Sequence, residues 1–281
     1  MPQTSSAYKY TWRLPILIWQ AAFFLVPLAF MLVMTFWLVK NYRMQPDFVL
    51  KNWDKMFSRG YFWDAYWLTL GRATLAAIIV SIVAFPASFA LAFKVSDTTR
   101  RWAVFFLIIP FFTSYLVRIY AWQVILAEQG VINAMIGSVG IGPVTMLNSG
   151  FGAMIGYLTL TLPLVVILQT FSLAAVDRNL IEAAWNLGCG RARTIRAVII
   201  PSARIGLILG AIFCFILSFG DFVSPYYLGG SKPPTLSILI IDTTKSGQQW
   251  PRAAVVAICM IVTLFVAAFA AIGAAYGRPK R

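Results

Sequence analysis

Histidine is absent from this chain of 281 residues, and charged residues make up only 11% of it. Without an imidazole the chain has no histidine base and no zinc-protease motif. The dipeptide Gly-Lys is also absent, which excludes a phosphate-binding loop of the G-x-x-x-x-G-K-[ST] type. The three cysteines show no C-x-x-C spacing, so neither a disulfide framework nor a metal site is indicated. These absences disfavour an enzyme, and we expect no catalytic residue, no metal and no cofactor in this chain.

Apolar residues dominate what is present. They make up 60% of the chain, and the mean hydropathy is +0.79. A membrane-spanning helix needs about 20 mainly apolar residues. Six continuous, non-alternating segments reach that length, which predicts an all-α integral membrane protein with six transmembrane helices. The predicted spans are residues 14–39, 66–93, 102–126, 151–175, 203–224 and 252–276.

The net charge of +14 has two possible meanings. In a soluble protein it would suggest nucleic acid, but here the basic residues fall mostly between apolar runs, where they set membrane orientation. Placing both termini in the cytoplasm puts the larger share of Lys and Arg inside. We therefore expect a cytoplasmic segment 1–13, a transmembrane domain 14–276 and a cytoplasmic tail 277–281, with lipid and not nucleic acid around the chain.

Two predicted external segments differ in character. Segment 40–65 is long and aromatic, whereas segment 127–150 is rich in glycine and contains VINAMIG (131–137). That short apolar run predicts an interfacial or re-entrant helix, because it cannot span a bilayer. The chain shows no convincing internal repeat, which is weak evidence against a secondary transporter built from inverted halves.

Segment 177–201 is the long polar interruption in the second half of the chain. Asp177 is a plausible N-cap for a helix that ends near Leu187, where Gly188 allows a left-handed conformation. A short basic helix should follow, and Pro201 suits the first turn of the next span. The residues alone leave two interpretations open, a solvated loop that obeys the positive-inside rule and a docking site for a soluble partner.

Glu182, Ala183 and Ala184, followed by Gly188 and a hydrophobic triplet that ends in Pro201, resemble the EAA loop of permease subunits of ATP-binding cassette (ABC) importers. Four further motifs are similar to the spermidine/putrescine permease group. They are PFFTSYLVRIYAW (110–122), EQGVIN (128–133), GDFVSPYYLGG (220–230) and WPRAA (250–254). The resemblance covers most of the chain from about Trp63 onward. Two departures, Cys189 for the usual alanine and Ile195 for a common aromatic, concern only the packing of the loop.

The resemblance implies a type I ABC importer permease with a MetI-like fold in a bacterial inner membrane. It implies three partners: a homologous permease that forms the other half of the pore, a cytoplasmic ATPase dimer that binds ATP and Mg, and an extracytoplasmic solute-binding protein. Within the EAA loop 177–203, the residues implied to couple this chain to the ATPase are Glu182, Ala183, Ala184, Gly188, Arg191 and Pro201.

Charged and aromatic residues inside the spans are candidates for the solute pathway. Arg118 is costly inside a membrane, and Asp221 is its most obvious opposite charge. Either Asp221 is a cation-binding acid on the route, or the two form a buried ion pair that stabilises the bundle. Tyr226, Tyr227 and Trp250 either form an aromatic box for an ammonium group or anchor the chain at the interface. The predicted pathway residues are Tyr115, Arg118, Trp122, Asp221 and Tyr226.

The solute expected from the resemblance is a polyamine. Related importers carry opines, thiamine, iron or phosphonates, and nothing in the spans excludes these solutes. A secondary transporter independent of ATP is the alternative from another class, and a membrane enzyme is a third.

Overall fold

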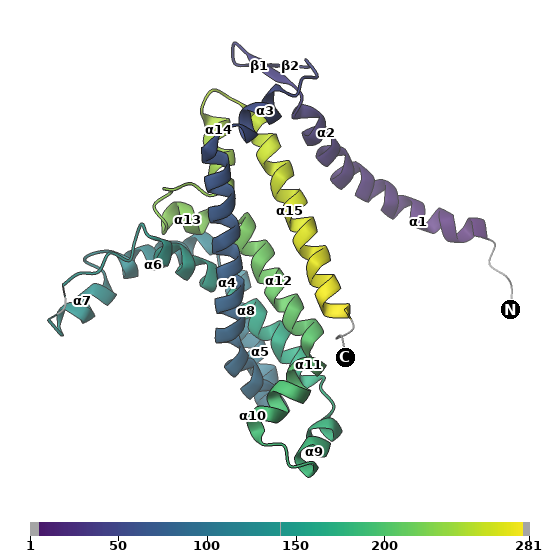
Figure 1. Ribbon diagram of the computed structural model, residues 1–281, viewed down its shortest axis with the longest axis vertical. Coiled ribbons are helices and arrows are strands. Elements are labelled where there is room, and N and C mark those ends of the chain that lie inside the picture. Colours follow the sequence, from purple (N-terminus) through teal and green to yellow (C-terminus); the bar gives the residue numbers. More distant parts are fainter. Residues whose placement is uncertain (1–5, 141, 278–281) are drawn as a thin grey trace. The chain divides into compact units, whose positions relative to one another are not determined.

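The computed structural model (Figure 1) describes residues 6–140 and 142–277. The chain divides into two compact units. Unit 1 comprises residues 1–63 and 239–260, and unit 2 comprises residues 64–238 and 261–281. The predicted tail 277–281 lies outside the described residues except for Gly277, as does the start of the predicted segment 1–13.

Unit 1 begins with an apolar helical stretch. It consists of α1 (Ser6–Gln20), a π-helical turn (Ala21–Leu25) and α2 (Val26–Met34). The predicted span 14–39 is therefore wrong at its end, because residues 38–45 form a hairpin of β1 (Leu38–Lys40) and antiparallel β2 (Arg43–Gln45). Asn41 and Tyr42 both have positive φ, at 51° and 60°, which is the geometry of a tight two-residue hairpin turn.

A buried asparagine fixes the next helix of unit 1, α3 (Lys51–Phe57). The Asn52 side-chain amide donates to the carbonyl oxygens of Thr35 at 2.8 Å and Trp37 at 2.6 Å. The Trp53 indole N–H donates to the Thr35 hydroxyl at 3.1 Å. With Asn52 and Met56 buried, one face of α3 is held against the chain and the other faces outward.

Unit 2 is built on α4 (Gly60–Phe93), α8 (Gly150–Ala174), α12 (Arg204–Gly220) and the end of α15 (Trp250–Tyr276). Small side chains line the buried side of α4, which allows close helix packing. α8 packs against α12 and α13 (Val223–Tyr227). Ser88 donates from α4 to the Val166 carbonyl of α8 at 3.2 Å. α14 (Leu236–Lys245) precedes α15.

One predicted span is bent, and a second bend lies where another predicted span begins. The span predicted over 102–126 is α5 (Asp97–Phe112) followed by α6 (Tyr115–Leu126), and α5 meets the stretch from α6 through α7 (Val131–Gly137) at 91°. Thr113 is extended there, with φ −95° and ψ 144°. Within the described residues, four helices are long and apolar enough to cross a membrane, and six crossings require that each of two bent pairs counts as one. The helix predicted within VINAMIG is confirmed as α7.

The second bent pair begins within segment 177–201. A helical stretch of α10 (Arg191–Thr194), a π-helical turn (Ile195–Ile199) and α11 (Ile200–Ser202) meets α12 at 74°. Pro201 lies in α11, so the prediction that it opens the following span is wrong. The π-helical turn explains its position: the proline ring collides with the carbonyl four residues earlier, and a widened turn relieves that collision. Pro27 follows a π-helical turn in the same way.

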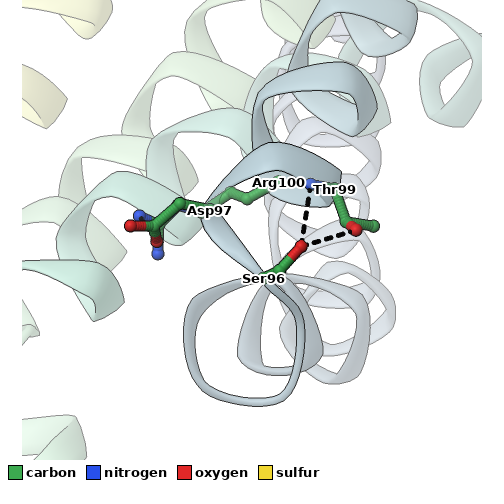
Figure 2. A network of polar contacts seen from close by, with 4 residues as sticks. All are labelled: Ser96, Asp97, Thr99 and Arg100. Atoms are coloured by element: carbon green, nitrogen blue, oxygen red, sulfur yellow. Dashed lines mark hydrogen bonds and ion pairs between the residues drawn. The ribbon is translucent and has the colours of Figure 1, made fainter.

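The turn between α4 and α5 is closed by a capped helix start (Figure 2). The Ser96 hydroxyl oxygen accepts a hydrogen bond from the Thr99 backbone N–H at 3.2 Å and pairs with the Thr99 hydroxyl at 2.9 Å. Asp97 and Arg100 form an ion pair at 2.7 Å. The first of these contacts satisfies one exposed backbone N–H in the first turn of α5.

Candidate functional site

Helix α9 (Arg178–Asn186) carries the first half of the predicted coupling segment, and it is capped as expected. The Asp177 carboxylate accepts a hydrogen bond from the Asn179 backbone N–H at 2.9 Å. At the other end Gly188 has φ +77°. The Gly188 N–H donates to the Trp185 carbonyl at 2.9 Å, and the Cys189 N–H donates to the Ala184 carbonyl at 3.0 Å. This pair of bonds is the Schellman closure of a helix, so the left-handed glycine is required locally.

One face of α9 packs inward. Ile181 and Ala184 are buried, and Ile181 belongs to a core cluster with Leu173 of α8 and Ile199 of the second π-helical turn. Phe89 and Phe93 of α4 pack against the same cluster. Ala184, one of the residues implied to couple this chain to the ATPase, is therefore turned inward, where its small side chain lets α9 approach its own chain.

The outward face of this segment is unusually apolar for a surface helix. Glu182 and Ala183 are exposed, as are Trp185 at 56% and Leu187 at 85%. A leucine so exposed in a rigid, capped helix marks a contact surface. Sequence reasoning did not single out these two apolar residues. Trp185 stands four residues after Ile181 at the rim of the buried face, and Leu187 is the C-cap residue, so an apolar side chain beside the glycine that ends the helix is the signal that could have found them.

Basic residues continue the surface beyond Gly188. Arg191, Arg193 and Arg196 are exposed, and within the described residues none of them forms an ion pair. Arg191 also lines a groove of about 480 Å³ with Lys94, Trp185 and the phenylalanines of α4. The segment thus presents an acid, two large apolar side chains and three cations on a fixed frame.

The second cluster of predicted residues centres on Asp221, which ends α12 and is 9% exposed. Its carboxylate accepts hydrogen bonds from four donors. Tyr115 O–H donates at 2.8 Å, Val223 N–H at 2.8 Å and Ser224 N–H at 3.3 Å, and the Ser224 hydroxyl donates as well. A carboxylate has about four acceptor positions. Three of the four bonds reach Oδ2 and one reaches Oδ1, so the acceptor position that remains for a cation is on Oδ1.

Arg118 does not pair with Asp221, so the predicted ion pair is wrong. The Arg118 guanidinium donates from Nη1 to the Thr159 carbonyl of α8 at 3.2 Å, and its Cζ lies 5.6 Å from the centre of the Tyr115 ring. Arg118 Nε is buried without a hydrogen-bond partner among the described residues. The arginine therefore fastens α6 to α8 through the Thr159 carbonyl, while its contact with the Tyr115 ring lies within α6.

Of the remaining pathway candidates, Trp122 is partly buried and Tyr226 is exposed. Trp122 packs beside a buried cluster that includes Ile119 and Val223. Tyr226 is 41% exposed and makes an edge contact with Tyr227 at 5.0 Å between ring centres. Trp250 begins α15 in unit 1. Sequence reasoning missed Ser224, the partner that completes the Asp221 cluster. Asp221 precedes α13, and a serine three residues after such an aspartate is a recognisable capping pattern.

Several helices that are long and apolar enough to cross a membrane define an integral membrane protein with multiple spans. Residues 84–278 match the family model described as binding-protein-dependent transport system inner membrane component. The chain belongs to this family.

Three individual proteins illustrate the similarity. The spermidine/putrescine transport system permease protein PotB of Haemophilus influenzae is 28% identical over 222 residues, which cover 78% of this chain and 77% of that protein. The solved structure of a bacterial ABC transporter involved in the import of alginate, an acidic polysaccharide, matches with a TM-score of 0.77 at 18% identity, covering 96% of both chains. A structure of a bacterial alginate ABC transporter in complex with an alginate-bound periplasmic protein matches with a TM-score of 0.72 at 16% identity, covering 93% of this chain and 91% of that one.

The predicted class and fold are thereby confirmed. The chain is a permease subunit of an ABC importer, a multi-pass protein of the bacterial inner membrane, with the helical fold of such permeases. The family to which it belongs is a transport component and not a catalytic one.

Proposed function

We propose that this permease subunit translocates a polyamine, spermidine or putrescine, in an importer that is powered by a separate ATPase. The observation that carries the substrate class is the similarity to PotB over 78% of the chain. The motifs at 110–122 and 220–230, which resemble the same permease group, bring Tyr115, Asp221 and Ser224 together.

The ATPase contact is assigned to the outward face of segment 177–201. Glu182 and Arg191 supply charges of opposite sign, Trp185 and Leu187 supply apolar area, and Gly188 leaves open space beside the backbone. Ala184 acts by packing α9 against its own chain, and Pro201 acts by its position before the bend at α12. The small side chain of Ala183 allows the partner to approach the exposed face closely. Because the chain has no phosphate-binding loop, ATP and Mg are bound by the partner.

A rigid connection favours transmission of force. α9 is joined to α4 and α8 through the cluster around Ile181, so movement of a docked ATPase would move these helices as one body. The bend between α11 and α12 supplies a place where the docked segment changes angle relative to the span. This arrangement suits alternating access, with a homologous permease as the other half of the pore.

The pathway residues divide their roles. The position of α6 beside α8 and α13 is set by Asp221, Tyr115 and Arg118. Trp122 packs against the same region. Tyr226 offers an exposed aromatic face, which attracts ammonium groups. In the proposed topology both termini face the cytoplasm, and the solute-binding protein docks from the opposite side.

Uptake by the reconstituted importer tests the proposal. The permease, its homologous partner and the ATPase are placed in liposomes with ATP inside, and entry of labelled spermidine is measured with the solute-binding protein outside. We expect uptake that requires both ATP and the binding protein. Uptake that follows a proton or sodium gradient without the ATPase would identify a secondary transporter. ATP-dependent uptake of 2-aminoethylphosphonate in place of spermidine would keep the importer and overturn the substrate.

A further inference from the structure

Four basic side chains gather in unit 1 and form what we call the cation patch: Lys51, Lys55, Arg59 and Arg252. Lys51 and Lys55 are spaced i, i+4 on α3 and share a face. Within the described residues the ion pairs are Lys40–Asp47 and Arg100–Asp97, so none of the four cations forms an ion pair there.

The four charges act on one another. The pKa of the Lys55 ammonium is lowered from its ordinary value, chiefly by the positive charge of Arg252, then by partial burial, and then by Lys51 and Arg59. Lys51 also stands at the first position of α3, where the helix dipole opposes a cation. Like charges at i, i+4 weaken a helix. The cation patch therefore lowers the stability of unit 1. The fold of unit 1 does not explain why these four cations lie together.

The patch is nevertheless presented on a fixed support. Asn52 and Met56 anchor the adjoining face of α3, and the two hydrogen bonds of Asn52 set the rotation of that helix. A solvated charge run needs no such anchoring. A rigid cationic surface is suited to an acidic surface on a partner, since complementary charge accelerates and orients docking.

Free polyamine is excluded as the occupant, because it carries the same sign of charge and would be repelled. We propose that the cation patch is the docking surface for an acidic region of the extracytoplasmic solute-binding protein. This inference rests on the proposed function, since it needs a binding-protein-dependent importer with segment 40–65 outside. The family to which the chain belongs transports in a binding-protein-dependent way.

The test compares two variants with the same change of charge in unit 1. Lys55→Glu reverses the centre of the patch, and Arg43→Glu reverses an exposed cation on β2 outside it. Each is assembled into the complete importer in nanodiscs of phosphatidylcholine only. The probe is the spermidine-loaded solute-binding protein of the same importer, and its association rate constant is measured at ~0.01 M and ~0.15 M ionic strength.

We expect Lys55→Glu to lower the association rate constant about tenfold at the lower salt and less at the higher, with Arg43→Glu unchanged. Equal behaviour of the two variants would overturn the inference while leaving uptake, and so the proposed function, intact. An effect of Lys55→Glu that appears only when phosphatidylglycerol is added would show that the patch binds anionic lipid, which also overturns it. If the wild-type importer takes up spermidine without any binding protein, the proposed function fails and the inference fails with it.

Discussion

Gly188 allows a test that separates backbone strain from contact with a partner. Its φ of +77° lies in the region that side chains disfavour, yet a Cβ added there meets nothing within 4 Å in this chain. Alanine at position 188 therefore clashes with no other residue of this chain. Its only cost is the strain of holding a side chain at a positive φ. That cost is about 1–2 kcal/mol, whereas asparagine adopts the left-handed conformation more readily.

The strain should appear in the two hydrogen bonds that close α9. A loss of one or two kcal/mol changes an opening equilibrium by about 5- to 30-fold. We therefore expect the amide hydrogens of residue 188 and Cys189 to exchange about 5- to 30-fold faster in Gly188→Ala. Gly188→Asn should change their exchange much less. Gly190→Ala is the control, because Gly190 has φ −70° and open space in the same loop.

Binding of the ATPase then tests whether Gly188 is also needed for contact with the partner. If the glycine serves only the backbone, Gly188→Asn should bind the ATPase as the wild type does. If the partner needs the open space, Gly188→Asn should keep its exchange protection and still lose ATPase binding and uptake. Equal exchange rates in the alanine and asparagine variants would refute the assignment of strain to the positive φ. Full activity of Gly188→Asp would remove Gly188 from the coupling residues.

Three further changes test the packing around the sites. Tyr115→Phe removes one donor to Asp221 and should destabilise the permease by about 1.5–3 kcal/mol, measured by thermal unfolding in detergent. Gly156→Ala places a methyl group against the Ser224 side chain and should cost about 1–3 kcal/mol, whereas Gly71→Ala, with open space in α4, should gain up to ~1 kcal/mol. Asn52→Ala leaves two carbonyl oxygens of unit 1 without the donor that the Asn52 amide supplies, at a cost of about 1–3 kcal/mol each. Amide hydrogens in the β1–β2 hairpin should then exchange faster. Unchanged exchange would show that water replaces the amide.

The coupling segment was predictable because its signals are local. A capping aspartate and a left-handed glycine act on backbone groups a few residues away, so Asp177 and Gly188 could be assigned from the chain alone. Ala184 could not, because the face of α9 that turns inward depends on Phe89, Phe93 and Ile199, which are distant in sequence. Local chemistry therefore gave the boundaries of the helix, and tertiary packing decided which of its residues are available to a partner.

The bends in the membrane helices were not predictable from apolarity. Thr113 and Ser114 are tolerated inside an apolar run, and hydropathy does not distinguish a straight helix from one that turns by 91°. Pro110 lies in the last turn of α5, and the Thr113 hydroxyl donates to its carbonyl at 2.9 Å. That bond satisfies a terminal carbonyl of α5 and stabilises the end of the helix. The break thus depends on a side chain that a composition window counts as merely polar.

Asp221 shows how a charge can be satisfied locally and still act at a distance. Pairing by sign alone selected Arg118, but the carboxylate is held by neutral donors, and the Arg118 guanidinium contacts a carbonyl and an aromatic ring. Neutral donors stabilise a negative charge without cancelling it. A passing polyamine would therefore be attracted by the field of Asp221 without displacing Tyr115 or Ser224. On this reasoning Asp221→Asn should weaken transport more than Tyr115→Phe does at equal loss of stability, and the reverse order would reduce Asp221 to a helix cap.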